Sequence, residues 1–135
     1  MVRALLYVSR NLIHYPDTDG DIEKLVAVSR SRNKSLDLTG ALISTEGNFA
    51  QILEGPSSSV TQVMESILRD PRHTDIVIVS DHAQSQRRFA NWAMAYSGRA
   101  AYVQQLLKPL TSPPDETTEA LERRLIQFMQ EFSVG

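Results

Sequence analysis

Hydrophobic positions along the chain fall into short patterns that predict strands alternating with helices. Residues Ala4 to Val8 form an uninterrupted apolar stretch, which is typical of a strand covered on both faces. After a turn-rich segment at 16–21, apolar residues at helical spacing predict a helix that ends near Asn33. Two short strands are expected at 38–44 and 48–54, joined by a hairpin in which Gly47 supplies a positive φ.

The middle of the chain predicts a second helix and then two more strands. Ser59 and Gln62 match a capping box at the start of this helix. Its apolar face consists of Val60, Val63, Met64, Ile67 and Leu68. The β-branched segment 75–80 and the partly alternating segment 88–97 complete the order β-α-β-β-α-β plus one strand. This order predicts an α+β, ferredoxin-like fold with an added fifth strand and both helices on one face of the sheet.

The C-terminal part of the chain predicts helices that cover the opposite face of the sheet or dock on a partner. The apolar side of a helix starting near Thr117 consists of Leu121, Leu125, Phe128, Met129 and Phe132. A shorter helix is expected at 102–107, and the breaker run 109–115 separates the two. We therefore divide the chain into a domain at 1–97 and a helical extension at 98–135 that belongs to the same compact unit.

Composition limits what kind of protein this can be. With 135 residues the chain can bury one core, and its lack of cysteine excludes disulfides, thiolate catalysis and a cysteine-bound flavin adduct. The net charge of −2 argues against nucleic acid and against an anionic membrane surface, as do arginine pairs such as Arg87 and Arg88 that are isolated and diluted by acidic residues. No apolar run is long enough for a secretory signal or a membrane span, which predicts a cytoplasmic protein.

Signatures of catalysis are missing as well. The sequence contains no phosphate loop, dinucleotide fingerprint, nucleophile elbow or zinc-protease motif. His14, His73 and His82 stand too far apart to suggest a metal site. We therefore expect a binding protein without a metal rather than an enzyme.

Two polar residues in apolar strands are the strongest candidates for a binding site. Gln51 lies in the apolar run Phe-Ala-Gln-Ile-Leu, and Tyr7 lies in the first strand, which the fold places beside it. Taken singly, each is an ordinary core residue with a satisfied hydrogen bond. Together with Asn33 they form a neutral, hydrogen-bonding cluster that suits a flat heteroaromatic ligand, with Leu25 and Ile67 as apolar walls.

Several motifs resemble, in order, those of the BLUF family of flavin photoreceptors. They are Tyr7-Val8-Ser9-Arg10, Ser31-Arg32-Asn33, Leu38-Thr39-Gly40-Ala41-Leu42, Phe49-Ala50-Gln51-Ile52-Leu53-Glu54-Gly55, Asp70-Pro71-Arg72-His73 and Arg88-Phe89-Ala90-Asn91-Trp92-Ala93-Met94. The resemblance covers residues 3–96 and is most specific in the Phe-x-Gln-x-Leu-Glu-Gly string with Leu-Thr-Gly ahead of it.

The resemblance implies non-covalent binding of FAD, with the isoalloxazine ring between the two helices. It implies that Tyr7 donates an electron to the excited flavin, and that Gln51 carries the proton and rearranges its hydrogen bonds to flavin N5 and O4. Asn33 is implied to bind the carbonyl and ring nitrogen edge, while Met94 and Trp92 lie on the strand that reads out the rearrangement. An amide suits this role because rotation or tautomerisation exchanges donor for acceptor without moving net charge.

The resemblance also implies a wider set of cofactor contacts. They are Leu25, Ser29, Arg32, Asn33, Leu53, Ile67, Asp70, Arg72 and His73. Arg32 stands where the family often has Asn or His, and Ser66 where some members carry Arg, so FMN or riboflavin remain alternatives to FAD. For Arg72 and His73 a helix-terminating charged turn is an equal alternative.

A sensor that signals to an unidentified downstream protein has two alternatives. A small enzyme of the acylphosphatase kind needs an early phosphate-cradling loop, and residues 10–15 lack the glycines for one. A light-blind oligomerisation module is the other alternative, against which the joint presence of Tyr7, Gln51 and Asn33 argues. Apolar residues on both sheet faces and the amphipathic tail predict a homo-oligomer.

Overall fold

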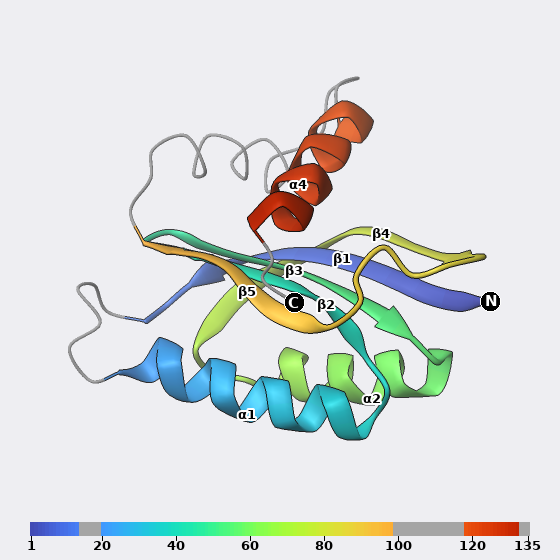
Figure 1. Cartoon of the computed structure of the whole chain (residues 1–135). Helices are drawn as coiled ribbons and strands as arrows, with labels where there is room; N and C mark the ends of the chain where they lie inside the picture. Colours follow the sequence, from blue (N-terminus) through green and yellow to red (C-terminus); the bar gives the residue numbers. More distant parts are fainter. Residues whose placement is uncertain (14–19, 99–117, 133–135) are drawn as a thin grey trace.

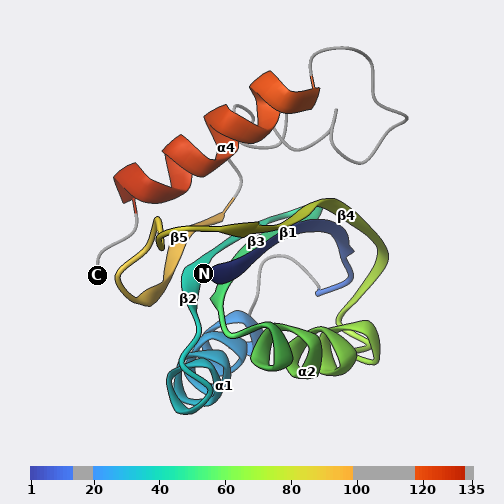
Figure 2. The same cartoon turned by 90° about the vertical axis from the view of Figure 1, so that its right-hand side faces the viewer.

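The computed structural model describes residues 1–13, 20–98 and 118–132. Within these residues a five-stranded sheet has helices on both faces (Figures 1 and 2). The shorter helix expected at 102–107 and the breaker run at 109–115 lie outside the described residues. Among the described helices, none is both long and apolar enough to cross a membrane.

The sheet has the strand order β4-β1-β3-β2-β5. Its strands are β1 (Val2–Asn11), β2 (Thr39–Thr45), β3 (Asn48–Gly55), β4 (His73–Gln84) and β5 (Trp92–Gly98). β1 pairs antiparallel with β3 and β4, β2 pairs antiparallel with β3, and β5 pairs parallel with β2. This is the predicted ferredoxin-like order with a fifth strand added at the β2 edge.

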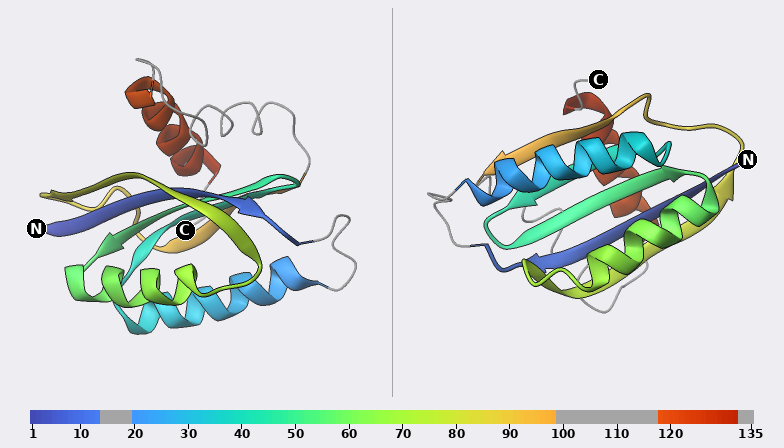
Figure 3. Two further views of the ribbon diagram at one scale, coloured as in Figure 1. Left: turned by 180° about the vertical axis from the view of Figure 1, so that it is seen from behind. Right: turned by 90° about the horizontal axis from the view of Figure 1, so that it is seen from below.

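Helices α1 (Asp21–Ser35) and α2 (Ser57–Leu68) lie side by side on one face of the sheet (Figure 3). Each is the crossover between two parallel strands that have a third strand between them, so both return across the same face. The core under the helices contains Leu5, Leu53, Val60, Val63 and Ile67, all buried. The sheet surface between the two helices is where the candidate site lies.

Helix α4 (Thr118–Phe132) covers the other face, as predicted. Its Leu125, Ile126 and Met129 are buried in one cluster with Leu6 and Val8 of β1. The residues Ala4–Ser9 of β1 are all buried because both faces are covered. The division of the chain into a domain and an extension stays a prediction.

Two local predictions were wrong. Helix α2 begins at Ser57 after Pro56, with no side-chain cap, so Ser59 and Gln62 are not its capping box. Among the described residues, the glycines with positive φ are Gly20, Gly40 and Gly55, so Gly47 does not turn the hairpin in that way. The side chain of Thr45 instead accepts from the backbone N–H of Asn48 at 3.0 Å and holds the turn.

Strand boundaries also differ from the sequence prediction. β4 runs from His73 to Gln84 rather than over 75–80, because the whole segment pairs with β1. β5 begins at Trp92 rather than Arg88. Residues 85–91 form a link between the two strands, here called the β4–β5 link, in which the backbone N–H groups of Arg88 and Phe89 bond to a side chain of β3.

Candidate functional site

Tyr7 and Gln51 lie directly opposite each other on the paired strands β1 and β3. Opposite residues of an antiparallel pair point to the same face, and this face is the one covered by α1 and α2. Both side chains are buried, and Gln51 Nε2 donates a hydrogen bond to the Tyr7 hydroxyl at 2.8 Å. The structure therefore brings together the two polar residues that the sequence singled out.

Trp92 completes this chain of hydrogen bonds from β5. Its Nε1 donates to Gln51 Oε1 at 2.8 Å, and its side chain is 5% exposed. An indole N–H can only donate, so it requires the amide oxygen of Gln51 to face it and the amide nitrogen to face Tyr7. The backbone of Met94 pairs with Leu42 of β2, and the structure does not describe the side chain of Met94.

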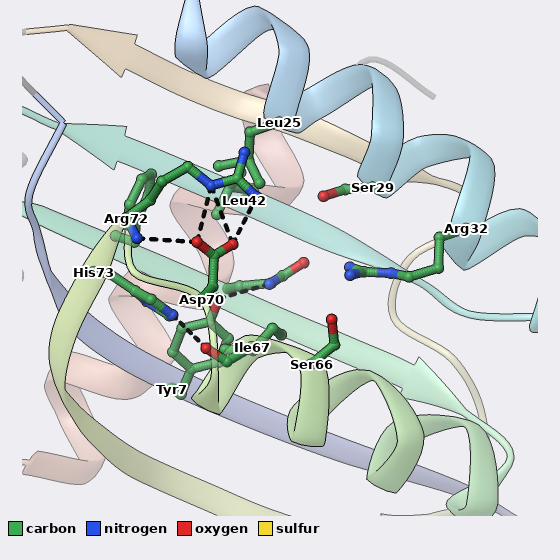
Figure 4. Close-up of a pocket in the computed structure, with 12 residues that line it drawn as sticks. Tyr7, Leu25, Ser29, Arg32, Leu42, Ser66, Ile67, Asp70, Arg72 and His73 are labelled. Atoms are coloured by element: carbon green, nitrogen blue, oxygen red, sulfur yellow. Dashed lines mark hydrogen bonds and ion pairs between the residues drawn. The ribbon is translucent and has the colours of Figure 1, made fainter.

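A cavity of about 40 Å³ opens beside these residues, between α1 and α2 (Figure 4). It is lined by Tyr7, Leu25, Ser29, Arg32, Leu42, Phe49, Gln51, Ser66, Ile67, Asp70, Arg72 and His73. This volume is smaller than the roughly 300–1,000 Å³ that is usual for small-molecule sites, so binding of a flat ligand requires the residues of α1 and α2 to move apart. Of the expected contacts, Asn33 and Leu53 are not among the lining residues, and Leu53 lies in the core beneath the helices.

Leu42 and Phe49 line the cavity although neither is among the site residues predicted from the sequence. Leu42 is the β2 partner of Gln51, and Phe49 precedes Gln51 by two residues on β3. Alternate residues of a strand share a face, so the hairpin register alone could have found both. Ser66 points toward Arg32 from the opposite helix (Figure 4), a placement that only the packing of α2 reveals.

Asn33 is fully buried near the end of α1, and its Nδ2 is the buried side-chain atom without a hydrogen-bond partner among the described residues. Its Oδ1 accepts from Arg32 Nε at 3.2 Å, and Arg32 itself lines the cavity. A buried, unsatisfied amide donor costs about 1–3 kcal/mol. The ring carbonyl of a flat heteroaromatic ligand is the kind of acceptor that would satisfy it.

Charged residues stand at the rim of the cavity. Arg72 donates to both oxygens of Asp70, with Nε at 2.9 Å from Oδ1 and Nη2 at 2.7 Å from Oδ2. Burial acts to raise the pKa of Asp70, but the hydrogen bonds from Arg72 outweigh it and hold that pKa below its ordinary value. The pKa of the half-buried Arg32 is lowered by burial, so its charge is incompletely solvated.

His73 both ends a helix and walls the cavity. Its Nε2 lies 2.7 Å from the carbonyl oxygen of Ile67 at the end of α2, and its Nδ1 lies 2.7 Å from Ser9 Oγ. A carbonyl oxygen only accepts, so Nε2 carries a hydrogen. The ring stands edge-on to Tyr7 and Phe49, with centroids 6.1 and 5.9 Å away. His73 therefore lies at the helix-terminating turn and also lines the cavity, so the two alternatives for this residue are compatible.

The Tyr7 phenol sits in an apolar setting that keeps it protonated. Burial raises the pKa of Tyr7 strongly, and the hydrogen bond from Gln51 opposes that shift only in part. Because Gln51 donates to the Tyr7 oxygen, the hydroxyl hydrogen remains available to a further acceptor. The site is thus a narrow, mostly apolar cavity with a phenol and an amide at its floor.

This fold and this site define a small α+β domain with a cavity between two helices on one face of its sheet. Residues 2–95 match the family described as BLUF, sensors of blue-light using FAD. The chain therefore belongs to the BLUF family of flavin-binding blue-light sensors.

Individual relatives agree with this membership. The Blue light- and temperature-regulated antirepressor BluF of Escherichia coli (strain K12) is 35% identical over 88 residues, which are 64% of this chain and 21% of that protein. The dark-state structure of BlrB, a BLUF protein, is 28% identical with a TM-score of 0.76 and covers 96% of each chain. A bacterial light-regulated adenylyl cyclase is 27% identical with a TM-score of 0.68, covering 99% of this chain and 40% of that one. The chain thus spans about a fifth of the curated relative's length.

Proposed function

We propose that this chain binds FAD in the cavity between α1 and α2 and senses blue light through Tyr7, Gln51 and Trp92, without catalytic turnover of its own. The observation that carries this proposal is the hydrogen-bonded chain that leads from Tyr7 and Gln51, which line the cavity, to Trp92 on β5. An enzyme of the acylphosphatase kind and a light-blind module have no comparable observation in their favour.

Residues around the cavity fit a flavin by their chemistry. Leu25 and Ile67 supply apolar surface from the two helices. Asn33 does not line the cavity, but it bonds the lining residue Arg32, and its unsatisfied Nδ2 is a donor for a ring carbonyl. Arg32 lines the cavity with a partly desolvated charge, which favours a flavin that carries phosphate. FAD and FMN have phosphate and riboflavin has none, so Arg32 favours the first two. We place FAD before FMN because the family is described as using FAD.

When bound and excited by blue light, a flavin is a strong oxidant that takes up an electron and a proton. Tyr7 would be the phenol that gives up the electron. Its hydroxyl proton would pass to the amide oxygen of Gln51 only after the amide turns, because in the present orientation Gln51 Nε2 donates to the phenol. When the electron and proton return, Tyr7 regains its original form. Gln51 is then left with its donor and acceptor exchanged, by rotation or by tautomerisation.

Trp92 connects this exchange to the sheet. In the orientation seen here the indole N–H faces the amide oxygen of Gln51. Rotation of the amide would set the Nε2 of Gln51 against the Nε1 of Trp92, and two donors cannot bond. Rotation would therefore break or move the Trp92 bond in the lit state and loosen the start of β5.

The signal is proposed to pass to another protein, which these residues do not identify. Relatives are named as an antirepressor and as a light-regulated adenylyl cyclase. Self-association also remains a proposal. The prediction of a homo-oligomer rested partly on the amphipathic helix α4. The apolar residues of α4 pack on the protein's own sheet, which weakens this argument for self-association. A cytoplasmic location likewise stays a proposal.

An absorption spectrum of the purified protein, in the dark and after blue light, tests the proposal. We expect a yellow protein whose flavin band shifts slightly to the red on illumination and returns in the dark. Protein that remains colourless and refuses added FAD contradicts flavin binding, and bound flavin without a reversible shift supports the light-blind alternative.

Cofactor identity is tested separately, by releasing the flavin with heat or acid and separating FAD, FMN and riboflavin by chromatography. Titration of flavin-free protein adds a comparison. We expect Arg32→Ala to weaken binding of FAD more than binding of riboflavin, because only FAD carries the phosphate that this charge attracts. Equal weakening for both ligands would show that Arg32 does not select for phosphate.

A further inference from the structure

Glu54 is a buried carboxylate at the end of β3 that the proposed mechanism does not use. Its side chain is 0% exposed, and it does not line the cavity. Its Oε1 accepts from the backbone N–H of Arg88 at 2.7 Å and of Phe89 at 2.9 Å, and its Oε2 accepts from the Gln84 side chain. All three donors belong to the β4–β5 link or to the last residue of β4.

The β4–β5 link is held in place by further contacts at its two ends. The Arg87 guanidinium donates to the backbone carbonyl of Glu54 and to Thr39 Oγ1, both at 2.9 Å. The carbonyl of Asn91 accepts from the backbone N–H of Gly40 at 3.0 Å. Between them, the side chain of Phe89 is buried in the cluster that packs under α4. Glu54 is thus the side chain that satisfies the backbone at the centre of the link.

We propose that Glu54 is a positioning residue for Trp92: its carboxylate fixes the β4–β5 link, and the fixed link holds the Trp92 indole against Gln51. This inference rests on the proposed function insofar as it concerns the light response. Phe89 precedes Trp92 by three residues, a reach of at most about 10 Å. An anchor at Phe89 therefore restricts where Trp92 can lie.

The carboxylate is suited to this task because one of its oxygens accepts two neighbouring N–H groups. Alanine at this position removes the acceptor of both N–H groups, and since Phe89 is buried the link must then move toward water to satisfy its N–H. Glutamine retains an amide oxygen at the same distance from the backbone, and Gln84 can turn its own amide oxygen toward the new NH₂ group. Glu54→Gln should therefore preserve the anchor and Glu54→Ala should remove it.

Trp92 is the single tryptophan of the chain, so tryptophan fluorescence reports its position alone. In flavin-free protein we expect Glu54→Ala to shift the emission to longer wavelength and to make it quenchable by acrylamide, with Glu54→Gln close to the parent protein. Asn11→Ala is the matched control, since it removes a buried polar group on β1 that bonds Thr45 and Ile13 and not the link. Should Glu54→Ala fail to fold, Glu54→Asp, whose acceptor is withdrawn by one methylene, is expected to show the same change.

Unchanged emission and quenching in a folded Glu54→Ala or Glu54→Asp variant overturns the proposal. So does an equal change in Asn11→Ala, because that result reflects general loosening. Since these measurements need no flavin, they are decided independently of the proposed light sensing.

In flavin-loaded protein the light response supplies a second readout. Losing the Trp92 bond removes stabilisation from the dark orientation of Gln51, so dark recovery is expected to be about three- to tenfold slower in Glu54→Ala. Trp92→Phe should slow recovery similarly, and the double variant should be no slower than Trp92→Phe alone, because both changes remove the same contact. Effects that multiply in the double variant would show that Glu54 acts on another part of the protein.

Discussion

The side chain of Gln51 lies between two groups with different hydrogen-bonding abilities. The Trp92 indole can only donate, whereas the Tyr7 hydroxyl can donate or accept. The orientation of the amide is therefore imposed by its neighbours. A change at Tyr7 is transmitted to Trp92 only if the amide of Gln51 turns or changes its tautomer. Gln51 is therefore the residue that links Tyr7 on β1 to Trp92 on β5.

Removal of either end of the Tyr7–Gln51 contact is expected to separate flavin binding from the light response. Tyr7→Phe removes the phenol that gives up the electron, and Gln51→Leu removes the amide that exchanges donor for acceptor. Both substitutions roughly keep side-chain volume, so both variants should still bind flavin. Absorption spectra before and after blue light measure the outcome, and a normal red shift in either variant contradicts the assigned role.

The raised pKa of Tyr7 predicts how stability depends on pH in alkali. The unfolded chain deprotonates this phenol near the ordinary pKa of 10.0, before the folded protein does. Its contribution is thus fully present below pH 10 and is lost as pH rises above that value. Tyr7→Phe should have a shallower fall in unfolding free energy above pH 10, measured by urea denaturation of flavin-free protein. Parallel curves for both proteins across that range contradict the assignment.

At the scale of elements, the close approach of β2 and β3 depends on a residue without a side chain. Gly40 has φ +145°, and a Cβ there would lie 1.9 Å from the backbone oxygen of Ile52. Both the strained conformation and the clash with backbone penalise any larger residue. This hairpin carries Gln51, so its geometry determines where the amide lies.

Gly40→Ala is expected to destabilise the protein by about 3 kcal/mol or more, because neither strand can yield without breaking the ladder. Gly47→Ala is the matched control in the same hairpin. An added Cβ there meets no atom within 4 Å and the backbone has no positive φ, so a change below about 1 kcal/mol is expected. Urea denaturation compares the two, and equal losses would show that the close approach at Gly40 is unimportant.

Elements were predictable from the sequence where periodicity and strand order determine them. The pairing of Tyr7 with Gln51 followed from placing the first and third strands side by side, and the structure confirms it. The orientation of Trp92 did not follow, because a tryptophan in an edge strand can be buried or exposed without a change of pattern. The role of Glu54 was hidden as well, since its partners are backbone groups of a link that has no periodicity of its own.

At the scale of the whole molecule, the sheet separates two apolar layers with different uses. The layer beneath α1 and α2 contains the cavity, whereas the layer beneath α4 is filled by side chains. Phe89 belongs to the second layer although it is three residues from Trp92, which contacts the first. The chain segment from Phe89 to Trp92 therefore passes from one layer to the other, and packing under α4 can influence the site through it.

This arrangement predicts the effect of a cavity under α4. Leu125 is fully buried against the sheet, so Leu125→Ala should cost about 2–5 kcal/mol of unfolding free energy. Arg124→Ala changes an exposed neighbour on the same helix and should cost less than about 0.5 kcal/mol. If the two layers communicate through the segment from Phe89 to Trp92, Leu125→Ala should also increase acrylamide quenching of Trp92 in the folded protein, measured far below the unfolding midpoint. Quenching equal to that of Arg124→Ala would mean that the sheet isolates the site from α4.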